Sequence, residues 1–364
     1  MFTKTEEFKS LYTSLKLGVS KMDAKGLSNF LIHCASLNIQ DNEVLEYAKH
    51  KIISGNFRQI NPQDLSNFLF AFGLTNFKDQ ELIENIVSKL EDDQPFNIFV
   101  ANRNLFALSR LDFYNEKLLN KIEQVLHFKK DLIGEGIVTN YLQCLSKFDH
   151  ISEKTKSILS REIIEKVGTY KYSSFATICT SMVKLNWNHK IMLDIVKNEI
   201  LKRFKEKEIE LIAAEIKPIE ITQMIVAYTH FNEFDSTILT LLEQVYMRHI
   251  EEAKGEETVA LVISHANWAR DMLKYDYDEC PKSVRRKAKK NEYMLNRLEK
   301  YFKRYNSELI IKVLDNLIQK KDNINSKAIF LVLANLNSIN IKKNSAKRKV
   351  VEFAIEGLHI IKRD

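Results

Sequence analysis

The sequence predicts an all-α fold, an α-solenoid of stacked helical hairpins with about 36–38 residues per repeat and six to eight repeats. The first observation is a repeated phrase, because Leu-Ser-Asn-Phe-Leu at residues 27–31 returns 38 positions later at residues 65–69. The second is composition, since 45% of the 364 residues are hydrophobic, which is enough for a continuous core. The third is that 9 Gly and 4 Pro are too few for an all-β protein rich in turns.

One turn residue marks each repeat. Starting from Ile39, the matching positions are Phe77, Phe113, Phe148, Trp187 and, more loosely, Glu233, at intervals of 38, 36, 35, 39 and 46 residues. The match weakens at Tyr277 and returns near Ile339, Asn340 and Ile341. The sequence therefore contains six repeats with a clear match and two with a weak one.

Each repeat is predicted to contain one helix before its turn and one after it. The apolar residues expected to form the buried side of the first helix are Leu27, Phe30, Leu31 and Cys34 in the first repeat, and Leu65, Phe68, Leu69 and Phe72 in the second. Those expected to form the buried side of the second helix are Val44, Leu45 and Ala48 in the first repeat, and Leu82, Ile83, Ile86 and Leu90 in the second. Offsets of three, four and seven residues place each set on one side of a helix. Pro62, Pro95 and Pro218 lie just before first helices, where the missing N–H does no harm.

Stacked repeats form one elongated domain without an internal boundary. We expect an N-terminal capping segment at residues 1–20, the helical-repeat array at 21–250, and a basic C-terminal helical region at 251–364 that continues the solenoid. No apolar run approaches the roughly 18 residues that span a bilayer, and the first residues lack a secretory hydrophobic stretch. We therefore expect a soluble protein that is neither secreted nor inserted in a membrane.

The residues that could support chemistry form no recognisable site. Cys34, Cys144, Cys179 and Cys280 make no CxxC pair and have no His at zinc-finger spacing, so we expect free buried thiols in a reducing compartment. The sequence has no Gly-rich phosphate loop, no GxSxG and no HExxH, and its nine histidines are scattered. We expect no enzymatic activity, no cofactor and no metal site.

Positive charge is concentrated in residues 282–304. Ten basic residues lie there against Glu292 and Glu299, namely Lys282, Arg285, Arg286, Lys287, Lys289, Lys290, Arg297, Lys300, Lys303 and Arg304. This segment carries a charge of +8 in a chain of +7, so the rest sums to −1. A second basic cluster contains Lys342, Lys343, Lys347, Arg348 and Lys349.

Such a local positive field is typical of a surface that binds a polyanion. Tyr293, Tyr301, Phe302 and Tyr305 lie among the charges, where they can stack on bases. The alternative interpretations are a solvated loop or a nuclear-localisation-like string at residues 285–290. The charge predicts an RNA-binding basic patch made of the two clusters.

The repeated phrase resembles the helical-repeat family that includes the octatricopeptide and heptatricopeptide repeats and the repeat region of FAST-kinase-like and RAP-domain proteins. The matching features are the Leu-Ser-Asn-Phe-Leu start, a small residue before the turn (Ala35, Gly73, Ser109), the turns at residues 37–39 and 111–113, and the apolar pair that follows. The resemblance covers roughly residues 20–245. The C-terminus shows no RAP-like domain, and acidic Glu6 and Glu7 lie where a presequence is usually basic.

The resemblance implies organellar RNA binding, since members of that family act in mitochondria or chloroplasts and some are built into mitochondrial ribosomes. It also implies that first helices line a concave face on which one polar residue per repeat meets a base. Ten positions before each turn residue, these are Asn29, Asn67, Arg103, Thr177, Gln223 and Asn267. Val138 breaks the series, and Thr139 or Asn140 could replace it if the register slips by one or two residues. The alternative is that this position is simply the solvent side of an amphipathic helix.

Three classes of function follow. The first, which we favour, is a non-catalytic RNA-binding protein of the mitochondrial matrix, a structural component of the mitochondrial ribosome. It would bind rRNA through the basic C-terminal region and neighbouring proteins through the repeats. A variant of this class is a transcript-specific RNA processing or stability factor. The second is a protein-protein scaffold subunit of another organellar complex, and the third is an unrecognised enzyme.

Overall fold

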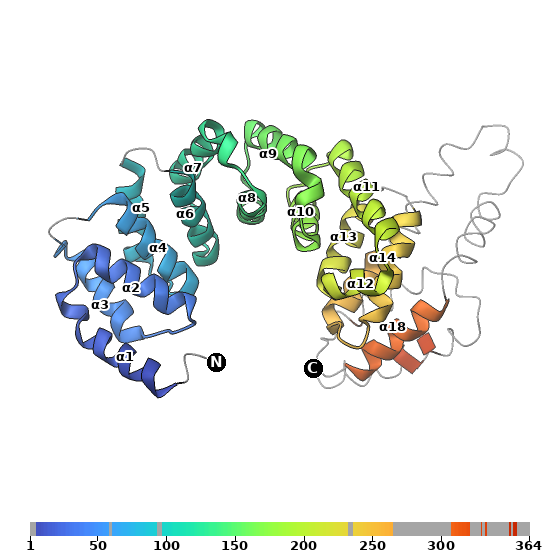
Figure 1. Cartoon of the computed structure of the whole chain (residues 1–364), viewed down its shortest axis with the longest axis horizontal. Helices are drawn as coiled ribbons and strands as arrows, with labels where there is room; N and C mark the ends of the chain where they lie inside the picture. The colour runs from blue at the N-terminus through green and yellow to red at the C-terminus, as the bar shows by residue number, and fades with distance from the viewer. Residues whose placement is uncertain are drawn as a thin grey trace, which may run out of the picture. The chain divides into compact units, whose positions relative to one another are not determined.

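The structure is a computed structural model of the whole chain, and it describes residues 5–57, 60–92, 97–231, 236–264 and 307–320, together with 329, 332, 349, 350 and 352–354. Every regular element in these residues is a helix and none is a strand, which confirms the all-α class (Figure 1). Contacts divide the chain into two compact units, Met1–Glu165 and Lys166–Asp364, and each is described by itself.

The helices of the first unit are α1 (Glu6–Leu17), η2 (Val19–Lys21), α2 (Ala24–Ser36), α3 (Asn42–Ile53), α4 (Pro62–Thr75), α5 (Gln80–Asp92), α6 (Ile98–Leu111), α7 (Glu116–Phe128), η3 (Lys130–Leu132), α8 (Glu135–Lys147) and α9 (Glu153–Lys166). Alternate helices pack on one another: α2 contacts α4, α4 contacts α6, and α6 contacts α8. The helices α3, α5 and α7 contact one another in the same order. This is the packing of a helical array in which first helices touch first helices and second helices touch second helices.

The second unit contains η4 (Val167–Thr169), α10 (Tyr172–Lys184), α11 (Lys190–Glu206), α12 (Ile209–Glu215), α13 (Pro218–His230), α14 (Ser236–Arg248) and α18 (Ser307–Gln319). The helix α10 packs on α13, and α14 packs on α11, α12 and α13. The short helix α12 is inserted between a second helix and the next first helix. Its insertion explains why 46 residues separate Trp187 from Glu233, against 36 to 38 between earlier repeats.

The same turn ends each of the first helices α2, α4, α6, α8 and α10. The residues with left-handed backbone are Asn38, Asn76, Asp112, Asp149 and Asn186, at φ between 45° and 57°. In each case the N–H of the next residue donates to a carbonyl five positions back, as Ile39 does to Cys34 at 2.8 Å and Trp187 to Met182 at 2.8 Å. This is the Schellman arrangement, and Asn and Asp tolerate its left-handed position better than most residues do.

The turn of the fourth repeat corrects the predicted register. The residue after the left-handed Asp149 is His150, whose N–H donates to Leu145 at 3.1 Å, so Phe148 is not the equivalent of Ile39. With His150 in place, the five turn residues follow at intervals of 38, 36, 37 and 37. Ten positions before His150 lies Asn140, whereas Val138 is fully buried.

A side chain three residues after the left-handed position caps each second helix. These side chains are Asp41, Asp79, Asn115, Ser152 and His189, which accept from the N–H of Val44, Leu82, Leu118, Thr155 and Met192 at 2.8 to 3.3 Å. Each cap satisfies an N–H that the helix itself leaves free. Turn and cap together fix where one helix of a hairpin ends and the next begins.

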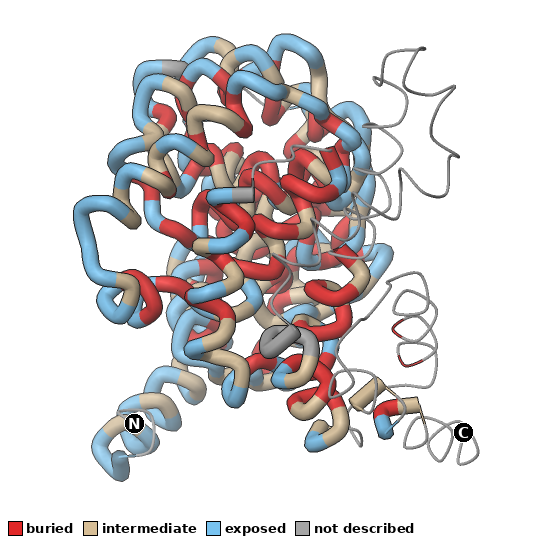
Figure 2. Tube along the Cα trace, turned by 90° about the vertical axis from the view of Figure 1, so that its right-hand side faces the viewer, coloured by how far each residue is buried: buried red, intermediate tan, exposed pale blue. Residues whose placement is uncertain are grey.

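Burial follows the predicted periodicity. Buried stretches alternate with exposed ones along the helices of the repeats (Figure 2), and Leu27, Leu65 and Phe68 are among the residues with no more than 2% exposure. Pro62 and Pro218 begin α4 and α13 as predicted, and Pro95 lies outside the described residues. Cys34, Cys144 and Cys179 are buried and free, and Cys280 also lies outside. None of the described helices is long and apolar enough to cross a membrane.

Candidate functional site

Most of the predicted basic patch lies outside the described residues. This holds for Lys282, Arg285, Arg286, Lys287, Lys289, Lys290, Arg297, Lys300, Lys303 and Arg304, and for Lys342, Lys343, Lys347 and Arg348. Lys349 is described, and its Nζ contacts Asp315 at 2.5 Å and Glu352 at 2.8 Å. Those carboxylates compensate its charge. The remainder of the patch stays a prediction.

The predicted polar row is joined by hydrogen bonds in the first three repeats. Asn67 on α4 donates its Nδ2 to Asn29 Oδ1 on α2 at 3.4 Å. Its Oδ1 accepts from Arg103 Nη1 on α6 at 3.2 Å and from Gln63 Nε2 at 3.0 Å. Asn67 is only 5% exposed, and both ends of its amide are bound inside the protein. Asn67 therefore connects successive first helices, while Asn29 and Arg103 lie at the surface.

Arg103 is the exposed residue at the end of the hydrogen-bonded row in the first three repeats. Its guanidinium lies over the Phe70 ring of α4, 5.6 Å from the centroid, and Phe70 packs against Phe106 of α6 at 5.5 Å. The Asn67 oxygen and the Phe70 ring hold the guanidinium from two sides. Arginine has five N–H donors, and one of them is bound to Asn67 in the described part of the chain. The side chain is exposed, and guanidinium groups commonly bind carboxylates and phosphates.

In the fourth repeat the row continues at Asn140 of α8. Asn140 donates its Nδ2 to Asn102 Oδ1 of α6 at 2.7 Å, and its Oδ1 accepts from the Cys144 thiol at 3.3 Å. The neighbouring Thr139 hydroxyl donates to the carbonyl of Glu135 in its own helix at 2.9 Å. Like Asn67, Asn140 connects its own first helix to the preceding one.

The second unit contains two further predicted residues. Thr177 on α10 and Gln223 on α13 are both half-buried, and the Thr177 hydroxyl donates to the Ser173 carbonyl at 2.9 Å. Asn267 lies outside the described residues. Within this unit, Thr177 and Gln223 occupy equivalent positions on two first helices that pack together.

Sequence reasoning missed a cation that recurs in the last turn of the first helices. Arg110 and Lys147 lie in the last turns of α6 and α8 in the first unit, and Lys184 ends α10 in the second unit. The three follow at intervals of 37 residues in the sequence, and all are exposed. Lys147 donates its Nζ to the Ser109 carbonyl at 2.5 Å. The corrected register reveals this recurrence, because a turn placed at Phe148 shifts Lys147 out of line with Arg110.

One carboxylate links three successive turns in the first unit. Asp112, at the left-handed position after α6, pairs with Lys78 of the preceding repeat and with Lys147 of the following one. The two ammonium groups lower the pKa of Asp112 to about 2. Two cations around one carboxylate give this cluster a net positive charge.

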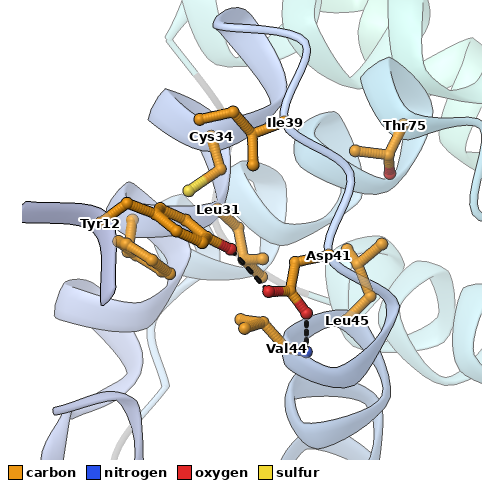
Figure 3. A pocket seen from close by; sticks show the side chains of 9 residues that line it. Tyr12, Leu31, Cys34, Ile39, Asp41, Val44, Leu45 and Thr75 are labelled. Atoms are coloured by element: carbon orange, nitrogen blue, oxygen red, sulfur yellow. Dashed lines mark hydrogen bonds between the residues drawn. The ribbon is translucent and has the colours of Figure 1, made fainter. Parts of the chain in front are cut away.

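A small pocket lies where α1 meets the first hairpin (Figure 3). The Tyr12 hydroxyl donates to Asp41 Oδ2 at 2.7 Å, Lys16 pairs with Asp41 at 2.8 Å, and the Tyr12 ring stacks on Phe30 at 6.0 Å. Burial raises the pKa of the Cys34 thiol in this pocket to about 11, so the thiol stays protonated and weakly nucleophilic. These contacts around the pocket hold α1 against the first hairpin.

In the part of the chain that the structure describes, no group of three His, Cys, Asp or Glu side chains could hold a metal ion. Comparisons with known proteins give no match to a family model and no similar curated protein. The resemblance read from the repeated phrase therefore stays a prediction.

Proposed function

We propose that this chain is a non-catalytic RNA-binding protein of the mitochondrial matrix, built as an α-solenoid of six to eight helical repeats. In this proposal it is a structural component of the mitochondrial ribosome. Its basic C-terminal region, residues 282–304 and 342–349, binds rRNA, and its repeats contact neighbouring proteins. Binding, rather than chemistry, is its mechanism.

The observation that carries the proposal is the separation of charge between the two helix layers of the first unit. The first helices α2, α4, α6 and α8 contain four basic residues, Lys25, Arg103, Arg110 and Lys147, and two acidic residues, Asp64 and Glu135. Asp64 is buried at 5% exposure, so it adds little to the surface. The second helices α3, α5, α7 and α9 contain nine basic and eleven acidic residues. Glu123 and Glu162 are buried as well, at 3% and 7% exposure, so the surface of the second helices is close to neutral. A positive first-helix layer beside a near-neutral second-helix layer favours a polyanion on the first helices.

The other part of the proposal, contact with neighbouring proteins, is supported by α1. Leu11, Leu15 and Leu17 are 56%, 43% and 78% exposed, and no residue of α1 is buried. Leu11 and Leu15, four residues apart, lie on one side of the helix, and exposed leucines favour contact with another protein. This feature also favours the second candidate, a scaffold subunit of another organellar complex.

Ultraviolet crosslinking in cells that make the protein, followed by purification, sequencing of the attached RNA and sedimentation, tests the proposal. Crosslinks to mitochondrial rRNA in a heavy particle are the expected result. Crosslinks to messenger RNA in light fractions favour a transcript-specific processing or stability factor. A heavy particle without crosslinked RNA favours the scaffold and contradicts the proposal.

A further inference from the structure

One side of α6 alternates aromatic and basic residues. Phe99, Arg103, Phe106 and Arg110 follow at intervals of four, three and four, which places them on one side of the helix. Phe99 is 63% exposed, Arg103 and Arg110 are exposed, and Phe106 is half-buried. We call these four residues the α6 stripe.

The α6 stripe is extended by the adjacent helix. Phe70 of α4 contacts Phe106 at 5.5 Å between ring centroids, with the ring planes tilted by 54°. The Arg103 guanidinium lies over the same Phe70 ring, 5.6 Å from its centroid. Aromatic rings from two repeats and an oriented guanidinium therefore lie together on the first-helix face of the first unit.

The amides on this face are already engaged. Asn67 is bound to Asn29, Gln63 and Arg103, and Asn102 is bound to Asn140. Reading the edge of a base needs free and accessible donors and acceptors, and Asn67, at 5% exposure with both ends of its amide bound, offers few. What the face does offer is ring surface and positive charge, and these contact any base and any phosphate.

We propose that the α6 stripe binds single-stranded RNA without base specificity, with bases stacked on Phe99 and on the Phe70 and Phe106 pair, and with Arg103 and Arg110 on phosphates. This inference rests on the proposed function and adds a second RNA contact, on α6, to that of the basic C-terminal region. Seven residues of helix span about 10 Å, so the two stacking positions are about three stacked nucleotides apart. Single-stranded RNA is the fitting partner because bases in an A-form duplex are stacked on one another and expose no faces.

The test uses the full-length chain and a fluorescein-labelled 20-nucleotide oligouridine, with fluorescence anisotropy as the readout. Phe99→Ala is expected to weaken binding about tenfold, since a stacked base contributes about 1–3 kcal/mol. Phe128→Ala is the matched control, because Phe128 is an 81% exposed phenylalanine at the end of α7. It is expected to bind as the unaltered chain does.

The phosphate contact is tested by salt dependence. Arg110→Gln is expected to make the slope of log affinity against log salt shallower by about 0.7, the loss of one contact to a single strand. Lys154→Gln, at an exposed position of α9, is the control and should leave the slope unchanged. Crosslinking to 4-thiouridine RNA should also label a peptide that contains Phe99 or Phe106.

The results separate two failures. If the unaltered chain binds RNA while Phe99→Ala and Arg110→Gln behave like their controls, the α6 stripe is not the contact and the proposed function stands. If the unaltered chain binds no RNA, the proposed function fails and this inference fails with it. Helix content by circular dichroism checks that each variant is folded.

Discussion

Gly73 of α4 lies so close to Ala107 of α6 that a Cβ atom on Gly73 would be 2.8 Å from the Ala107 Cα. No ordinary Cβ contact is that short. Because the obstacle is backbone, it cannot rotate away as a flexible side chain does. This contact sets the distance between the first helices of the second and third repeats.

Gly73→Ala is therefore expected to destabilise the protein by about 1–3 kcal/mol, the usual cost of overpacking. Urea unfolding followed by circular dichroism measures it. Gly136→Ala on α8 is the matched control, since nothing lies within 4 Å of the added Cβ. It is expected to be neutral or stabilising by up to about 1 kcal/mol, as alanine favours helix. Equal effects of the two changes would show that the helices do not approach so closely.

Asn104 on α6 is fully buried, and its Oδ1 and Nδ2 have no hydrogen-bond partner in the described part of the chain. An unpaired buried amide costs about 1–3 kcal/mol. Asn104→Leu keeps a similar size and removes that cost, so we expect the urea midpoint to rise. Asn140→Leu, which breaks the bonds to Asn102, should lower it. Destabilisation by Asn104→Leu would show that Asn104 has a partner, such as a buried water.

Asp112 should contribute stability that depends on pH. Its pKa is lowered to about 2 by Lys147 and Lys78, so the folded chain favours its charged form. The contribution is present above the ordinary pKa near 4 and is lost as pH falls towards 2. The melting temperature of Asp112→Asn should lie below that of the unaltered chain at pH 7, and the gap should close by about pH 2. A gap that stays constant across this range would exclude the ion pairs as its source.

Arg203 on α11 joins three elements of the second unit, α10, α11 and η4, in a way that lysine cannot reproduce. Its guanidinium lies 4.9 Å from the Phe175 ring and 5.3 Å from the Tyr172 ring, and its Nε donates to Glu199 at 2.8 Å. It also donates to the Gly168 carbonyl at 3.2 Å. Arg203→Lys should lower the free energy of unfolding, measured in urea, by about 1–2 kcal/mol. The planar guanidinium with several donors is replaced by a compact ammonium group, which cannot make all of these contacts. Lys202→Arg, at an exposed neighbour, should change little.

The helices were predictable because their signals are local. Leu27 and Leu31, or Leu65 and Leu69, show helical spacing within one turn, and Asn38 or Asn76 marks the end of the helix by its tolerance of left-handed backbone. The register of the fourth repeat was wrong because the prediction followed an apolar residue, Phe148. The turn is instead defined by the backbone of Asp149 and His150.

The surface of the first helices was less predictable. The sequence indicates that Asn67 lies on the polar side of its helix, but it does not show that Gln63 and Arg103 cover it. The contact with Arg103 depends on the next repeat, 36 residues away. The α6 stripe was missed for a related reason, since Phe99 and Phe106 have the spacing expected of buried residues, and only the packed array shows Phe99 exposed.

The most direct test of the central claim, RNA binding, is the affinity of the purified full-length chain for single-stranded RNA between about 50 and about 200 mM salt. It is measured beside a variant in which Arg285, Arg286, Lys287, Lys289 and Lys290 are replaced by Gln. The account predicts saturable binding that weakens steeply with salt, and a slope shallower by about 3.5 in the variant, at about 0.7 for each of the five lost contacts. No saturable binding at the lowest salt, or an affinity that neither salt nor the replacement changes, would contradict it.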